Sequence, residues 1–124
     1  MIIARAAGAS EFVDLNAFVV VVAENPDGTG WRLEVLRALE FDEQDVALGM
    51  DTYCLCTADG AAHYGGVIRW QVLDGVFGME LGEAAARDLQ LPRSLRIRLE
   101  VSESDARVVE DGLRRAFGEG LPPH

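Results

Sequence analysis

Two cysteines and one histidine are the residues of this sequence whose types and spacing could do chemistry. One residue separates Cys54 from Cys56, and His63 follows an Asp59-Gly60 pair that is typical of a tight turn between strands. A two-residue loop there would pair Cys56 with His63, which predicts that all three side chains share one face of a hairpin. Thiolate and imidazole groups suit zinc, and three ligands with an open position are typical of a catalytic zinc site.

Several features weigh against such chemistry. The spacing is Cys-x-Cys rather than Cys-x-x-Cys, no fourth ligand is evident, and nothing signals a third group that would orient a Cys-His pair. The sequence also contains no Walker loop, dinucleotide fingerprint, nucleophile elbow or His-Glu-x-x-His motif. We therefore expect no enzyme and no cofactor, and keep a metal-binding or ligand-binding face at Cys54, Cys56 and His63 as the alternative.

Net charge excludes several classes of partner. The 124 residues include 11 basic residues, all of them arginine, against 21 acidic ones, which gives a net charge of -10. Phosphate and anionic lipid would repel such a surface, so we expect neither nucleic acid nor a membrane as partner. With two cysteines and no secretory leader in sight, a disulfide framework is not expected and a cytoplasmic location is.

The acidic residues are concentrated in one stretch. Between Arg37 and Arg69 there is no basic residue, and the acids there are Glu40, Asp42, Glu43, Asp45, Asp51 and Asp59. A patch of one sign speeds the encounter with a partner of the opposite sign. The alternative is a solvated loop that only keeps the protein soluble.

Alternating apolar residues and turn pairs predict the elements around these residues. Asp74-Gly75 predicts a hairpin in which Trp70 faces Met79 and Ile68 faces Leu81 on the core face, while Arg69 lies across from Glu80 on the opposite face. A short helix is predicted over 83–90, and a capping signature at 102–105 begins a final helix with an apolar stripe of Ala106, Val109, Leu113, Ala116 and Phe117. The fold class is therefore α+β: one mostly antiparallel sheet of about six strands, with a short helix and a C-terminal helix packed on one face. We predict a single domain over 1–124, with 1–10 and 119–124 as candidates for fraying.

One stretch carries a family resemblance. Residues Leu36 to Leu55, followed by His63-Tyr64-Gly65-Gly66-Val67, resemble the Immunity protein 10 family of bacterial polymorphic-toxin systems, and the resemblance covers residues about 18 to 101. It implies a non-catalytic protein that binds and neutralises a cognate toxin. Many toxin domains of such systems are nucleases, as the resemblance also implies, and an acidic surface could occlude their basic active site.

The resemblance and the charge pattern meet at residues 40–51. We expect the toxin to be contacted there and at the nearby strand, by Glu40, Phe41, Asp42, Glu43, Asp45, Asp51, His63 and Tyr64. Against this, Phe41 and Met50 could simply hold the loop on the core. A third interpretation is an assembly module whose edge strand pairs in a homodimer.

Overall fold

The structure, a computed structural model, describes all of residues 1–124 and contains nine strands and three α-helices. The strands are β1 (Ile2–Ala4), β2 (Ala6–Phe12), β3 (Ala17–Ala23), β4 (Arg32–Ala38), β5 (Cys54–Thr57), β6 (Ala62–Tyr64), β7 (Val67–Leu73), β8 (Val76–Leu81) and β9 (Ser94–Leu99). The helices are α1 (Glu43–Ala47), α2 (Glu83–Leu89) and α3 (Glu103–Phe117), and a short 3-10 turn, Val13–Leu15, joins β2 to β3.

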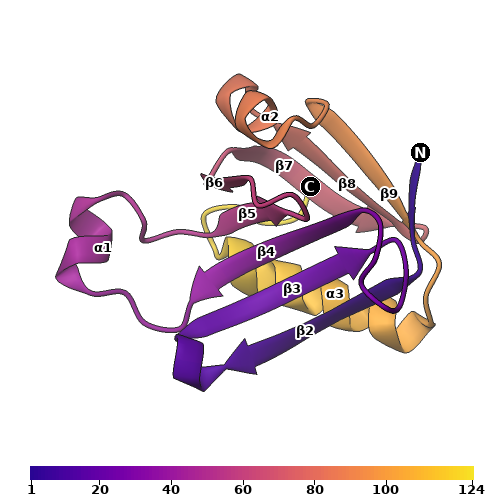
Figure 1. The fold of residues 1–124 in the computed structure, drawn as a ribbon, viewed down its shortest axis with the longest axis horizontal. Coiled ribbons are helices and arrows are strands. Elements are labelled where there is room, and N and C mark those ends of the chain that lie inside the picture. The colour runs from indigo at the N-terminus through magenta and orange to yellow at the C-terminus, as the bar shows by residue number, and fades with distance from the viewer.

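The strands form two sheets (Figure 1). One has the order β1-β9-β8-β7 and the other the order β2-β3-β4-β5-β6. All neighbouring strands are antiparallel except β1 and β9, which are parallel. The α+β class with antiparallel strands, a short helix and a C-terminal helix is confirmed, while the strands number nine and divide between two sheets rather than forming one sheet of about six.

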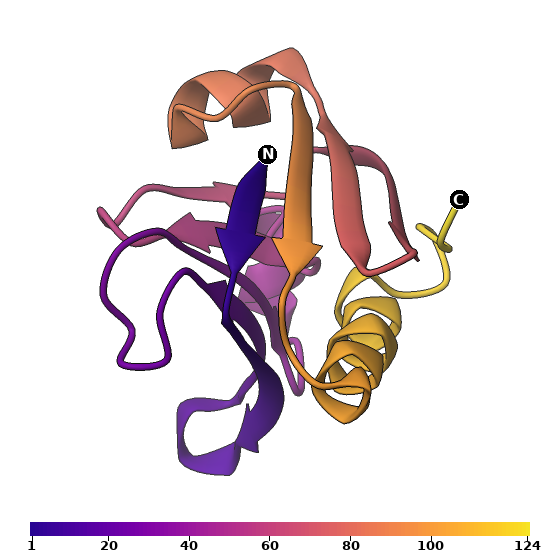
Figure 2. The same cartoon turned by 90° about the vertical axis from the view of Figure 1, so that its right-hand side faces the viewer.

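The two sheets pack their inner faces into one hydrophobic core. Figure 2 shows β1 leading from the four-stranded sheet into β2 of the five-stranded one, and α3 along the open side between them. On α3, Val109, Leu113, Ala116 and Phe117 are buried, and the Phe117 ring packs 5.2 Å from that of Trp70 in β7. The predicted apolar stripe of the final helix is therefore confirmed, as is Ser102 as its N-cap, because its hydroxyl accepts from the Asp105 N–H at 3.1 Å.

Both chain ends, candidates for fraying in the sequence, lie within hydrogen-bonded structure. Residues 2–4 pair with β9 and residues 6–12 pair with β3. The backbone N–H of His124 donates to the Trp70 carbonyl at 2.7 Å, and the Trp70 indole N–H donates to the Leu121 carbonyl at 2.8 Å. Sequence patterning misses β2 because Ala, Gly and Ser have weak strand propensity, whereas its pairing comes from the backbone.

The Asp74-Gly75 hairpin forms largely as predicted. Both turn residues have positive φ (53° and 75°), and Trp70 pairs with Met79. A bulge after Val67 then shifts the register, so that Val67 rather than Ile68 faces Leu81. The bulge turns Ile68 outward, which corrects its predicted place in the core.

Candidate functional site

The second Asp-Gly turn forms a different loop from the one predicted. Thr57 donates its N–H to the Ala61 carbonyl at 3.0 Å, so the loop has three residues rather than two. Gly60 has a φ of +90°, whereas Asp59 is not left-handed and caps the turn by accepting from the Ala61 N–H at 3.2 Å. The extra loop residue moves the register by one, as in hairpins that end in a glycine bulge.

This register separates the cysteines from the histidine. Cys56 pairs with Ala62 and Leu55 pairs with His63, so both cysteines lie on the outer face of the five-stranded sheet and His63 lies on the inner face. The predicted trio Cys54, Cys56 and His63 is therefore wrong as a shared face. No group of three or more His, Cys, Asp or Glu side chains in the structure could hold a metal ion.

The Cys56 thiol on the outer face is held in its protonated form. The Sγ atoms of Cys54 and Cys56 lie 3.9 Å apart, and both cysteines are free. Burial and the neighbouring Cys54 raise the pKa of Cys56 to about 12. A thiol with such a raised pKa carries almost no thiolate at neutral pH and is a poor nucleophile.

His63 has a structural setting at the junction of β6 and α2. Its Nδ1 lies 2.8 Å from a carboxylate oxygen of Asp88, and this hydrogen bond lowers the pKa of Asp88 below its usual value. The backbone packs closely beside it, because a Cβ on Gly66 would meet the Ala85 methyl at 2.5 Å. His63 is thus tied to α2 rather than turned toward the outer face, where Tyr64 lies.

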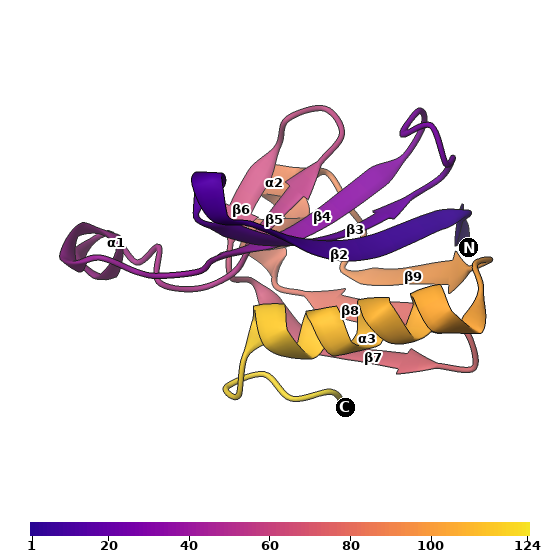
Figure 3. The same cartoon turned by 90° about the horizontal axis from the view of Figure 1, so that it is seen from below.

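Residues 40–51, which we call the acidic finger, extend away from the sheets. Figures 1 and 3 show α1 and its flanking loops beyond the ends of β4 and β5. Glu40, Asp42, Glu43 and Asp51 are exposed, Asp45 is half-buried, and α1 buries none of its residues. The finger therefore presents its side chains to solvent rather than to the core.

A reciprocal capping box holds the finger in shape. The Asp42 carboxylate accepts from the Asp45 N–H at 2.8 Å, and the Asp45 carboxylate accepts from the Asp42 N–H at 3.0 Å. At the base, Asn16 bonds both the Glu40 N–H and the Glu40 carbonyl at 3.0 Å. Two of the five finger carboxylates thus also have a structural role.

No arginine of this chain neutralises the finger. None of the six ion pairs of the structure involves a finger carboxylate. The nearby Arg37 instead donates to the Ala116 carbonyl at 3.0 Å and lies over the Phe41 ring, 5.2 Å from its centroid. Phe41, predicted as a contact residue, is half-buried and anchors the base of the finger.

Apolar side chains stand among the free carboxylates. Val46 is 57% exposed and Leu48 is 62% exposed, and Tyr64 on the outer face of β6 is 44% exposed. The pKa of Tyr64 is raised mainly by desolvation, then by Cys54, Cys56 and Asp45. Sequence analysis left Val46 out of the contact residues, although an apolar side chain on a short acidic helix was a signal that could have found it.

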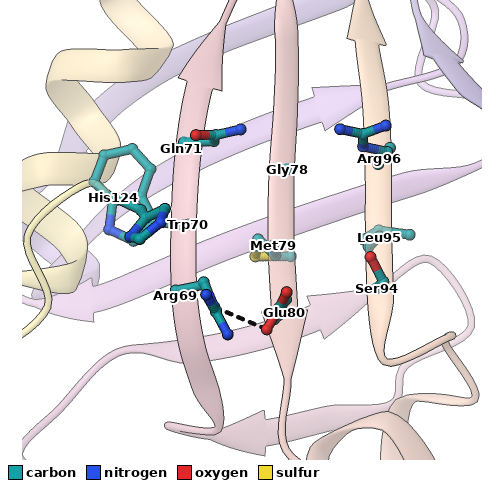
Figure 4. A pocket seen from close by; sticks show the side chains of 10 residues that line it. All are labelled: Arg69, Trp70, Gln71, Gly78, Met79, Glu80, Ser94, Leu95, Arg96 and His124. Carbon is teal, nitrogen blue, oxygen red and sulfur yellow. Dashed lines mark ion pairs between the residues drawn. The ribbon is translucent and has the colours of Figure 1, made fainter.

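A hollow on the other sheet offers little to a small ligand. On the outer face of β7, β8 and β9, Gly78 has no side chain between Gln71 and Arg96, and Arg69 pairs with Glu80 at 2.8 Å as predicted (Figure 4). The hollow measures about 170 Å³. Ligand pockets usually measure roughly 300 to 1,000 Å³, so this hollow is too small to define an active site.

Two packed sheets and an exposed acidic finger, whose carboxylates have no arginine partner, are the main features of the molecule. The family model of Immunity protein 10 matches residues 3–107, and the chain therefore belongs to that family. Membership assigns it an immunity role, which implies binding to a cognate toxin. No curated protein and no solved structure matches the chain. None of its helices is long and apolar enough to cross a membrane.

Proposed function

We propose that this protein neutralises its toxin by inserting the acidic finger into a basic surface of the toxin. The observation that carries the proposal is a set of five exposed or half-exposed carboxylates with no arginine partner of their own. Such a surface attracts a cationic partner from a distance. Contact with guanidinium or ammonium groups would then complete the ion pairs that the free protein leaves open.

The apolar residues of the finger would anchor the complex. Val46 and Leu48 gain little from the free fold because they are exposed, and they would lose contact with water inside an interface. Binding energy in interfaces usually concentrates in a few such central anchors within a polar rim. Tyr64 would lie at the margin of the same surface, while His63 would act only indirectly, through the β6–α2 junction.

A nuclease is the toxin class that this surface fits best. A nuclease cleft must be cationic to hold phosphate, and the finger would compete with phosphate for the same groups. The proposal therefore places the complex in the cytoplasm, where nucleic acid is the toxin's target, and assigns the immunity protein no catalytic step. Added DNA or RNA should compete with the immunity protein for the toxin.

Charge reversal tests the docking surface. In the variant Glu40→Lys, Glu43→Lys, Asp51→Lys the capping box is intact, so α1 still forms. With the purified toxin domain encoded beside this protein, we expect the association rate to fall about 10-fold or more at low salt and to lose most of its salt dependence. The measurement is stopped-flow or surface-plasmon kinetics at several ionic strengths.

A matched variant separates the finger from the net charge. Glu100→Lys, Asp111→Lys, Glu119→Lys makes the same change in charge at exposed residues outside the finger that form no ion pair. It should slow association only slightly. Equal effects of the two triple variants would remove the finger from the interface, and failure of the unmodified protein to bind would reject the toxin chosen.

A further inference from the structure

The free edge of β2 lies outside the docking surface proposed above. Three of the four sheet edges are short or covered: β1 and β6 have three residues each, and the C-terminal tail bonds to β7 at Trp70. β2 has seven residues and pairs only with β3. An unpaired edge of this length presents a row of backbone groups that can accept another strand.

Backbone geometry shows which groups face outward. The Glu24 N–H donates to the Trp31 carbonyl at 2.7 Å, so the even-numbered residues of β3 face β4 and the odd-numbered ones face β2. Because Ala23, Val21 and Val19 pair with Ala6, Gly8 and Ser10, the intervening residues Ala7, Ala9 and Glu11 direct their N–H and C=O groups toward the free edge. The register with β3 has no bulge, and residues 6–10 include neither proline nor a charged residue. The edge thus lacks the features with which proteins usually prevent strand addition.

We propose that two copies of this chain pair through β2 in antiparallel orientation, with the two-fold axis at Gly8. Gly8 then faces Gly8 of the second copy, and Ala6 faces Ser10, so small side chains meet along the junction. The same register brings Arg5, which directly precedes β2, is exposed and has no ion pair in its own chain, beside Glu11 of the second copy, whose exposed carboxylate would then lie between Arg5 and its own Arg115. This charge complementarity favours a second copy as the occupant of the edge.

Helix α3 adds an apolar contact beside the same edge. Gly112 packs on β2, since a Cβ there would meet the Ala9 methyl at 3.0 Å. Val108 lies one helical turn earlier on that face and is 42% exposed. In the dimer Val108 would be covered by the second copy. The antiparallel axis turns the two acidic fingers to opposite ends of a joined ten-stranded sheet, so their charges lie far apart and both stay free.

Sedimentation velocity of the full chain tests this dimer without any toxin. At about 100 µM, a dissociation constant of about 10 µM would leave most chains paired. We expect a mass of twice 13.5 kDa there and 13.5 kDa on dilution. A mass of 13.5 kDa at every concentration would overturn the proposal.

Two matched lysine variants locate the interface. Gly8→Lys fits the free chain, because nothing lies within 4 Å of a Cβ there, but the axis would bring two ammonium groups face to face. It should weaken dimerisation at least 10-fold, whereas Ala62→Lys on the opposite edge of the same sheet should not. Equal effects of the two variants would contradict the β2 interface.

Hydrogen exchange of the unmodified chain decides the case even if Gly8→Lys fails to fold. In the dimer the outward amides of Ala7 and Ala9, which pair with each other across the junction, should be protected at high concentration and exchange at least 10-fold faster on dilution. Fast exchange at both concentrations would overturn the proposal. Protection that arises only when the toxin domain is added would also overturn it, because the edge would then belong to the toxin.

Discussion

The helices α1 and α3 begin alike but serve opposite purposes. Each has an N-cap side chain that accepts a backbone N–H, Asp42 in α1 and Ser102 in α3. Beyond its cap, α3 buries five residues in the core, whereas α1 buries none and leaves Val46 exposed. The difference teaches that a capped helix need not contribute to the core: α3 stabilises the fold, whereas α1 keeps an exposed loop in a defined shape, as the proposed docking surface requires.

The same substitution in the two regions gives the largest expected contrast. Leu113 in α3 is 0% exposed and Leu48 in the finger is 62% exposed. Leu113→Ala should lower the free energy of unfolding by about 2 to 5 kcal/mol, because it removes buried methyl groups and leaves a cavity. Leu48→Ala should change it by less than about 0.5 kcal/mol. Urea unfolding followed by tryptophan fluorescence measures the free energy of unfolding of both variants. A similar decrease for the two would contradict the view that α3 belongs to the core and the finger does not.

A smaller effect is expected where α3 approaches the sheet most closely. A Cβ on Gly112 would meet Val20 Cγ2 at 2.9 Å and the Ala9 methyl at 3.0 Å. Gly112→Ala gains about 1 kcal/mol of helix propensity but overpacks a buried contact, which costs about 1 to 3 kcal/mol. We expect a net loss of about 1 kcal/mol. Gly120→Ala, with nothing within 4 Å of its Cβ, is the control, and a stabilised Gly112→Ala variant would show that the helix can move away from the sheet.

Residues with strong local signals were predicted well. Alternation and a turn pair that adopts positive φ at both positions placed Trp70 opposite Met79, and spacing placed Leu113 in the core. At Asp59-Gly60 the same dipeptide failed, because the Asp59 carboxylate bonds the Ala61 N–H and closes a three-residue loop. The loop length depends on this one side-chain hydrogen bond, which the dipeptide alone does not reveal. The wrong loop length also gave the wrong register, and the metal-site alternative depended on that register.

A central position in a sheet does not mean that both faces of the strand are buried. The run Val19 to Val22 is apolar on both faces, which is typical of a strand covered on both sides, and β3 does lie between β2 and β4. Its burial nevertheless alternates, with Val20 and Val22 buried and Val19 and Val21 half-exposed on the uncovered outer face. The candidate contact residues of the finger could be chosen from charge alone, whereas the inward position of His63 depended on register.

The two caps offer a finer test of the same contrast. Ser102→Ala should lower the global free energy of unfolding by about 1 kcal/mol, because α3 belongs to the cooperative core. Asp42→Ala removes the equivalent acceptor from α1 but should leave global unfolding within about 0.5 kcal/mol. Its effect should be local: faster hydrogen exchange at the Asp45 amide, which loses its acceptor. A global loss from Asp42→Ala as large as that from Ser102→Ala would make the finger part of the core.

The last prediction concerns the outer face of β5, at Cys56. Burial and the Cys54 thiol raise the pKa of Cys56 from 9.0 to about 12 in the folded chain. The folded thiol therefore holds its proton where the unfolded thiol releases it, so this group's contribution to stability is complete below about pH 9 and is lost as the pH rises toward 12. Cys56→Ala should lose less stability than the unmodified chain between pH 7 and pH 10, as judged from urea midpoints. Tyr53 and Tyr64 are present in both proteins, so parallel pH profiles would show that the Cys56 thiol is as solvated in the fold as it is in the unfolded chain.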